Sequence, residues 1–210
     1  MHSINPQNCE PRQIYKLMTG LIVPRPIALV STMDRAGVSN LAPFSFFCGV
    51  GSNPPTLLFC TALRTAVTEG NGRSDCRKDT LRNVEETGEF VVNVVDQDLA
   101  SAANITAAEV GPEVDEFELA GLASLTSEVV RPRRVATSPA QMECRLLQVI
   151  YTGWNAGAGV VVLGEILRFH VRDDLLEDFR VNAEQLRAVG RMAGNTWVKT
   201  SERFELIRPR

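Results

Sequence analysis

Short apolar runs rich in β-branched residues, separated by proline- and glycine-containing turns, restrict the fold more than any other feature of this sequence. Pro24-Arg25-Pro26 blocks a helix immediately before the apolar run 27–31. The turn residues 34–37 follow that run, so a hairpin is predicted whose second strand lies at 38–47.

The other apolar runs extend this pattern along the chain. Strands are predicted at 57–61, 90–95, 142–150 and 160–171, whereas helices are indicated at 79–87 and 99–110. Strands and helices therefore do not alternate one by one, as they would around a parallel sheet. The pattern favours a mainly β fold with short helices, built as an antiparallel barrel of about six strands.

The length of the chain suits one hydrophobic core. Its 210 residues are 44% hydrophobic, which is typical of a single domain. We therefore expect one domain over 1–210, in which the loop-like stretch 111–139 forms a lid or covering segment. The glycine-containing tail 186–210 is expected to wrap around the body and to end in a short strand at 204–207.

Charge and hydropathy exclude several classes of partner. The net charge is −3 without a cluster of Lys and Arg, so binding to a nucleic-acid backbone is not indicated. The N-terminus lacks a basic stretch followed by an apolar one, and no run approaches the roughly 18 apolar residues of a membrane span. We expect a cytoplasmic protein that does not bind membranes.

Cysteine and histidine are too scattered to indicate a metal site. The five cysteines contain no C-x-x-C pair, so free thiols in a reducing compartment are the simplest interpretation. With His2 and His170 alone, neither a histidine-rich metal site nor a Ser-His-acid triad is favoured. We interpret His170 as a surface histidine on a strand face with Arg168 and Arg172, with a titrating switch or a subunit contact as alternatives.

A candidate phosphate site lies at the start of the predicted helix 79–87. Arg77 and Lys78 supply two cations and Thr80 a hydroxyl, where the free N–H groups and dipole of a helix favour an anion. Asp79 or Thr80 could equally cap the helix within an ordinary solvated turn. Cys76 is placed beside this segment.

A second group of small polar residues lies on the predicted hairpin. Ser31 and Thr32 end its first strand, and Asn40 to Ser45 arrive from the other side. Hydroxyl, amide and backbone N–H donors beside an apolar platform suit the edge of a flavin ring. The alternative is that these residues mark turns and that Phe44, Phe46 and Phe47 belong to the core.

Taken together, the two groups are similar to those of a known family. The stretch from Pro24 to Thr32, followed by Asp34, Gly37, Asn40, Ala42-Pro43 and Ser45, closely resembles the first FMN-binding segment of the flavin reductase-like family. The segment 77–83 resembles that family's phosphate-binding segment. Later matches follow in the same order, at 88–93, 115–118, 121–122, 139–144, 164–166 and 190–194, so the resemblance spans about residues 10–209.

The resemblance implies an FMN-binding split barrel of the flavoredoxin-like branch, usually a homodimer. It assigns Ser31, Thr32, Asn40, Leu41, Ala42 and Ser45 to the flavin ring and ribityl chain. It assigns Arg77, Lys78, Asp79 and Thr80 to the phosphate. Arg191 and Trp197 match a C-terminal segment that often reaches the flavin.

The implied activity is an NAD(P)H-dependent flavin reductase, in which hydride passes from nicotinamide to the flavin N5 and the reduced flavin serves a partner oxygenase or another acceptor. One alternative is a flavoredoxin-like electron-transfer protein that holds FMN tightly and does not turn over NAD(P)H. A flavin-free binding module is another. Ala158-Gly159 stands where some relatives carry a histidine near the nicotinamide, which leaves the hydride donor open.

Overall fold

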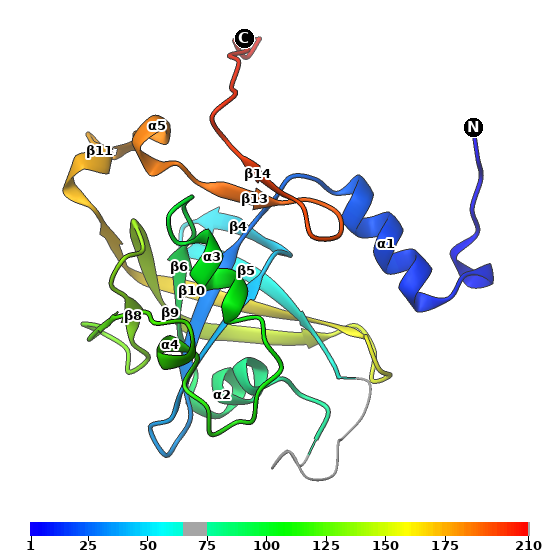
Figure 1. The fold of residues 1–210 in the computed structure, drawn as a ribbon, viewed down its shortest axis with the longest axis horizontal. Helices are drawn as coiled ribbons and strands as arrows, with labels where there is room; N and C mark the ends of the chain where they lie inside the picture. The colour runs from blue at the N-terminus through cyan, green and yellow to red at the C-terminus, as the bar shows by residue number, and fades with distance from the viewer. Residues whose placement is uncertain (65–74, 210) are drawn as a thin grey trace.

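The computed structural model describes residues 1–64 and 75–209, and its largest element is a seven-stranded antiparallel sheet (Figure 1). Its strands are β2 (Ala28–Met33), β3 (Ser39–Phe44), β4 (Phe47–Ser52), β5 (Pro55–Ala62), β6 (Glu89–Val94), β9 (Ala140–Tyr151) and β10 (Gly159–Val171). They are ordered β3-β2-β6-β9-β10-β5-β4, and all neighbours are antiparallel. The predicted mainly β, antiparallel class is confirmed.

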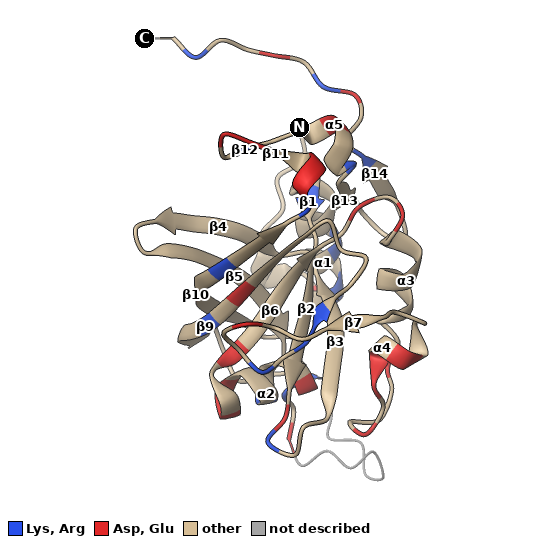
Figure 2. Ribbon diagram, turned by 90° about the vertical axis from the view of Figure 1, so that its left-hand side faces the viewer, with Lys and Arg blue, Asp and Glu red and all other residues tan. Residues whose placement is uncertain are grey.

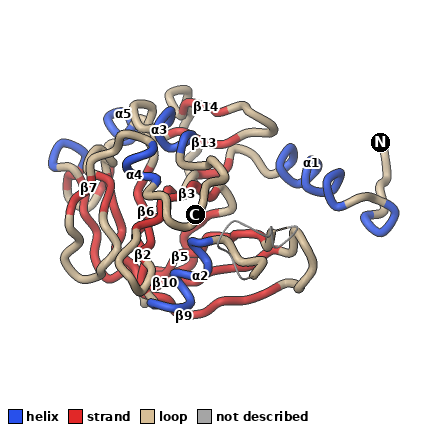
Figure 3. The backbone as a smooth tube through the Cα atoms, turned by 60° about the horizontal axis from the view of Figure 1, so that its bottom comes forward, coloured by secondary structure: helices blue, strands red, loops and turns tan. Residues whose placement is uncertain are grey.

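Short helices and small ribbons surround this sheet. The helices are α1 (Pro11–Leu21), α2 (Asp79–Thr87), α3 (Ala100–Ile105), α4 (Glu116–Leu119) and α5 (Ala183–Leu186), with 3₁₀ turns at Pro6–Asn8 and Asp173–Leu175. The ribbons join β1 (Arg25–Pro26), β13 (Val189–Arg191) and β14 (Trp197–Lys199), then β7 (Ser124–Leu125) with β8 (Arg134–Val135), and β11 (Leu176–Glu177) with β12 (Arg180–Val181). Figures 1 and 3 show α1 extending away from the strands.

Both faces of β2 are buried, which explains the nearly continuous apolar run in the sequence. Ala28 and Val30 join one core cluster, which Leu81 and Val84 of α2 also enter. Leu29 points to the opposite face and packs in a second cluster with residues of α3 and α4. A strand without a solvent face shows no alternation of apolar and polar residues.

One glycine is fixed by a close aromatic contact. A Cβ atom at Gly164 of β10 would lie 2.3 Å from Cζ of Phe90 on β6, so no larger residue fits there without moving the ring. Phe90 in turn meets Phe59 edge-on, with ring centroids 5.4 Å apart. The glycine thus allows the aromatic core to approach the backbone of β10.

Most of the predicted elements are found, with several differences, among them β4, which was not predicted as a separate strand. The helix expected over 99–110 is limited to α3, and the strand expected at 204–207 is wrong because that stretch forms no strand. Helix α1 was not predicted, although Glu10 and Gln13 cap it reciprocally. Among the described residues, no helix combines the length and apolarity needed to cross a membrane.

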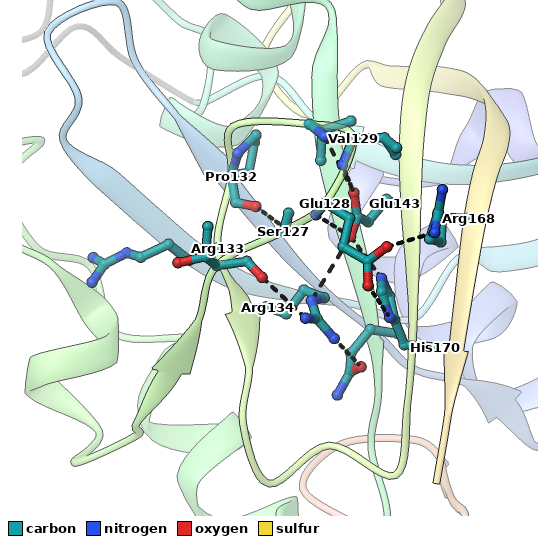
Figure 4. Close-up of polar contacts among 12 residues, drawn as sticks. Ser127, Glu128, Val129, Pro132, Arg133, Arg134, Glu143, Arg168 and His170 are labelled. Carbon is teal, nitrogen blue, oxygen red and sulfur yellow. Dashed lines mark hydrogen bonds and ion pairs between the residues drawn. The ribbon is translucent and has the colours of Figure 1, made fainter. Parts of the chain in front are cut away.

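A buried carboxylate fastens the stretch 127–135 to the sheet; we call this stretch the strap. Glu143 on β9 is 0% exposed, and its side chain accepts backbone N–H groups of Glu128, Val129 and Val130 at 2.8, 2.7 and 3.2 Å (Figure 4). These bonds hold the pKa of Glu143 below its ordinary value although burial alone would raise it.

The interpretation of His170 as a surface histidine is wrong. Its side chain is 16% exposed, and Nε2 lies 2.6 Å from Oε1 of Glu143 (Figure 4). Its strand neighbour Arg168 pairs instead with Glu128 at 2.5 Å. The strap covers this part of β10 and leaves His170 only partly exposed, which the alternation along the strand could not reveal.

We expect Glu143→Gln to lower the free energy of unfolding by about 1–3 kcal/mol near neutral pH, because a charged acceptor of several hydrogen bonds is lost. Since folding depresses the pKa of Glu143, its charge contributes stability above the ordinary carboxylate pKa, and this contribution is lost as the pH falls through the depressed value. The deficit of the variant should therefore shrink in acid. Urea unfolding at several pH values measures it.

The matched control is Glu128→Gln, which removes a half-exposed carboxylate of the same cluster. An exposed ion pair of this kind is worth about 0–1 kcal/mol. Equal losses in the two variants would contradict the role assigned to the buried carboxylate.

Candidate functional site

A cavity of about 140 Å³ lies where the β2–β3 hairpin meets the start of α2. Residues from β3, from the start of α2, from the loop after α3 and from α4 form its wall. They are Asn40, Ala42, Pro43, Phe44, Arg64, Lys78, Asp79, Thr80, Thr106, Ala107, Ala108, Glu109, Val110 and Glu116. The fold thus brings together the two segments that the sequence singled out separately.

Two buried hydrogen bonds join the hairpin to α2. The Asn40 amide donates to Oγ1 of Thr80 at 2.9 Å, and the amide of Asn83, one turn further along α2, donates to Oγ1 of Thr32 at 3.1 Å. All four residues are buried. Asn83 was not predicted to have a role, and its place in the family-like segment 77–83 was the available signal.

Ser31 and Thr32 lie inside the protein and do not line the cavity. The Ser31 hydroxyl donates to the carbonyl oxygen of Arg133 in the strap at 2.5 Å. Both hydroxyls therefore connect β2 to its neighbours. Ala42 and Pro43 of β3, by contrast, are part of the cavity wall and give it an apolar side.

The two cations predicted to hold a phosphate point in different directions. Arg77 is engaged by Asp75 and Glu85, at 2.6 and 2.8 Å, and these carboxylates raise its pKa. Lys78 lines the cavity, with Nζ 6.0 Å from the centre of the Phe44 ring. Arg77 thus braces α2, and Lys78 remains at the cavity.

Arg64, which follows β5, supplies the second cation of the cavity wall, where the sequence analysis had predicted Arg77. It pairs with Asp79 at 3.0 Å and donates to the carbonyl oxygen of Arg77 at 3.2 Å. Asp79 also pairs with Arg82 at 2.6 Å. Burial, and then the charge of Arg64, lower the pKa of Lys78.

Glu116 is a wall residue that the sequence analysis did not select. It begins α4, whose acidic residues are red in Figure 2, and its side chain accepts the backbone N–H of Leu41 at 2.9 Å. Burial, followed by the charges of Asp79 and Asp115, raises the pKa of Glu116 to about 7. The backbone N–H of Leu41, a residue that the resemblance assigned to the flavin, therefore donates to Glu116.

Arg25 organises the far end of the hairpin. Its side chain is buried and donates to the carbonyl oxygens of Thr19, Ile22 and Met192 at 2.6, 3.0 and 2.9 Å, and to the Ser45 hydroxyl at 3.3 Å. The Pro-Arg-Pro segment therefore connects α1, Ser45 and the C-terminal ribbon.

Arg191 and Trp197 lie opposite each other on β13 and β14, with the guanidinium 5.4 Å from the ring centre. They border a second hollow of about 700 Å³ together with residues of α3. The residues of α3 that line this hollow directly precede, along the chain, the loop that lines the first cavity. Ser45 lines neither of them.

The described cysteines are free thiols, and Cys76 is half-buried against the core cluster of Phe59 and Phe90. It packs beside α2 and is absent from the cavity wall. No group of three or more metal-ligating side chains occurs within residues 1–64 and 75–209.

The solved structures that resemble this chain include three proteins of differing similarity. Nitrilotriacetate monooxygenase component B from Bacillus cereus is 39% identical with a TM-score of 0.89, and the match covers 98% of each chain. The 2-nitrobenzoate 2-nitroreductase NbaA from Pseudomonas fluorescens is 28% identical with a TM-score of 0.86, over 99% of this chain and 96% of that one. Flavoredoxin from Desulfovibrio vulgaris (Miyazaki F) shares the fold at 22% identity and a TM-score of 0.71, over 88% and 91% of the two chains.

A profile described as "Flavin reductase like domain" matches residues 19–190, which include both hairpin strands, α2, α4 and most of β13. Together with the fold, this match shows that the chain belongs to the flavin reductase-like family of split barrels.

Proposed function

We propose that the chain binds FMN with its phosphate end in the cavity between β3 and α2, and that it acts as an NAD(P)H-dependent flavin reductase. The Asn40–Thr80 hydrogen bond carries this assignment, because it joins the two family-like segments at the wall that also holds Lys78 and Arg64. Two cations, a hydroxyl and the N-terminus of α2 form a donor set suited to a phosphate.

The size and the lining of the first cavity suit the phosphate end of FMN. A cavity of about 140 Å³ is smaller than the roughly 300–1,000 Å³ of sites that enclose a drug-sized ligand, so it suits the phosphate and the adjoining chain. Ala42 and Pro43 offer an apolar edge next to it. The second hollow, with Arg191 and Trp197, is our candidate for the region near the ring.

When bound, FMN would supply the redox chemistry by accepting hydride at N5 from a nicotinamide and passing the electrons on. The residues of this chain act by binding and orientation. Lys78 and Arg64 would neutralise the phosphate, and Asn40 would hold the Thr80 hydroxyl toward it. Arg25 fixes Ser45 relative to the C-terminal ribbon, which keeps that side of the site rigid.

The likeness to a component B of a monooxygenase supports an oxygenase as the acceptor of the reduced flavin. The alternative is an electron carrier that holds FMN tightly. Its support is the fold that this chain shares with flavoredoxin.

A homodimer is also proposed, because α1 stands away from the sheet (Figure 3). The helix presents exposed apolar side chains such as Tyr15, Met18 and Leu21. Light scattering should give about twice the chain mass of 23.1 kDa. A mass of one chain at micromolar concentration would contradict this arrangement.

Anaerobic titration tests the activity. We expect NADH or NADPH to bleach the visible absorption of the FMN-loaded protein, and dialysis to remove much of the flavin, because a reductase must release its product. Protein that stays yellow through dialysis and is bleached by neither nicotinamide would overturn the reductase and favour the carrier.

Lys78→Ala should weaken FMN binding by about 1–3 kcal/mol, because one charged partner of the phosphate is removed. Riboflavin, which lacks the phosphate, should bind the variant and the wild type equally. Fluorescence quenching measures both affinities, and Lys16→Ala on α1 is the matched control. Equal losses for the two ligands would show that the phosphate lies elsewhere.

A further inference from the structure

A carboxylate stands in the wall of the cavity that we assign to the phosphate. Glu116 is 7% exposed, and its Oε2 accepts the N–H of Leu41, the residue after Asn40. Lys78 and Thr80 line the same cavity. An ionised carboxylate at this place would repel a phosphate group, whereas a neutral carboxyl would not.

The charges that raise the pKa of Glu116 are those of two aspartates, Asp79 and Asp115. Asp79 approaches from α2, but it is already paired with Arg64 and Arg82. Asp115 on the same short helix is paired with Arg133 of the strap. The other charged groups of the cavity wall are Lys78 and Glu109.

Burial and the two nearby aspartates place the pKa of Glu116 at about 7, so both of its protonation states are populated near neutrality. Either state keeps the hydrogen bond from Leu41, because a carboxyl oxygen accepts in both. The backbone of β3 is therefore held while the charge of the wall changes.

We propose that Glu116 is a positioning residue that takes up a proton from solvent when the phosphate of FMN enters the cavity, so that this protein binds FMN more weakly as the pH rises above neutrality. The inference rests on the proposed function. Its physical basis is like-charge repulsion between the carboxylate and the phosphate across the shared cavity, which favours the neutral carboxyl in the complex.

The ligand's own titration has the opposite sign. The second ionisation of a phosphate monoester lies near pH 6 and adds negative charge as the pH rises. That change would strengthen binding to Lys78 and Arg64. A loss of affinity above neutrality must therefore come from the protein.

Glu116→Gln tests the proposal, because glutamine keeps an acceptor for Leu41 and cannot ionise. For the wild type we expect the Kd for FMN to rise about sixfold from pH 6.5 to 8.5. This change corresponds to a pKa of Glu116 that is about one unit higher in the complex than in the free protein. Calorimetry in two buffers of different ionisation enthalpy should show uptake of about half a proton near pH 7.5.

The Glu116→Gln variant should show neither effect, and Glu118→Gln, which alters an exposed residue of the same helix, should behave as the wild type. Riboflavin should bind the wild type without pH dependence. FMN binding without proton uptake, or with the same pH dependence in Glu116→Gln, would overturn the inference and leave the proposed function standing. No FMN binding at any pH would instead overturn the proposed function.

Discussion

The site depends on the attachment of a β-hairpin to a short helix. Asn40 and Thr80, and Thr32 and Asn83, form two buried side-chain hydrogen bonds between β2–β3 and α2. Buried polar groups are costly unless paired, so each bond fixes the position of its partners as well as contributing stability. The cavity exists because these bonds, with the apolar contacts of Leu81 and Val84, set the distance between helix and hairpin.

The cations near this cavity form two groups. Arg77 and Arg82 lie against carboxylates of α2 and its preceding loop, and they stabilise the helix itself. Lys78 and Arg64 line the cavity. In the site that we propose, Arg77 and Arg82 of the segment 77–83 stabilise α2, whereas Lys78 of the same segment faces the ligand. The sequence pattern alone does not tell which cation has which role.

The elements that the sequence predicts correctly are those determined by residues close together in the chain. The strand at 27–31 follows from a proline pair and a run of apolar residues, and α2 follows from its apolar spacing and the closing Gly88, whose φ is +73°. The tail at 204–207 has an equally apolar pattern but gains no partner strand, and hence no strand forms.

The parts that the sequence missed depend on contacts between distant residues. Glu116 reaches Leu41 across 75 positions, and His170 meets Glu143 across 27. No local pattern reports such pairings. Glu116 lies in the segment 115–118, which resembles the family, but the resemblance did not indicate what its side chain contacts.

The strap also bears on how α4 is held. A helix of four residues has almost no stability of its own. Arg133 in the strap pairs with Asp115 at its start and donates to Ser39 of β3, while Glu143 secures the other part of the strap. The position of the cavity wall at Glu116 therefore depends on the bonds that the strap makes to β9. In the site that we propose, substitutions around Glu143 would change the affinity for flavin.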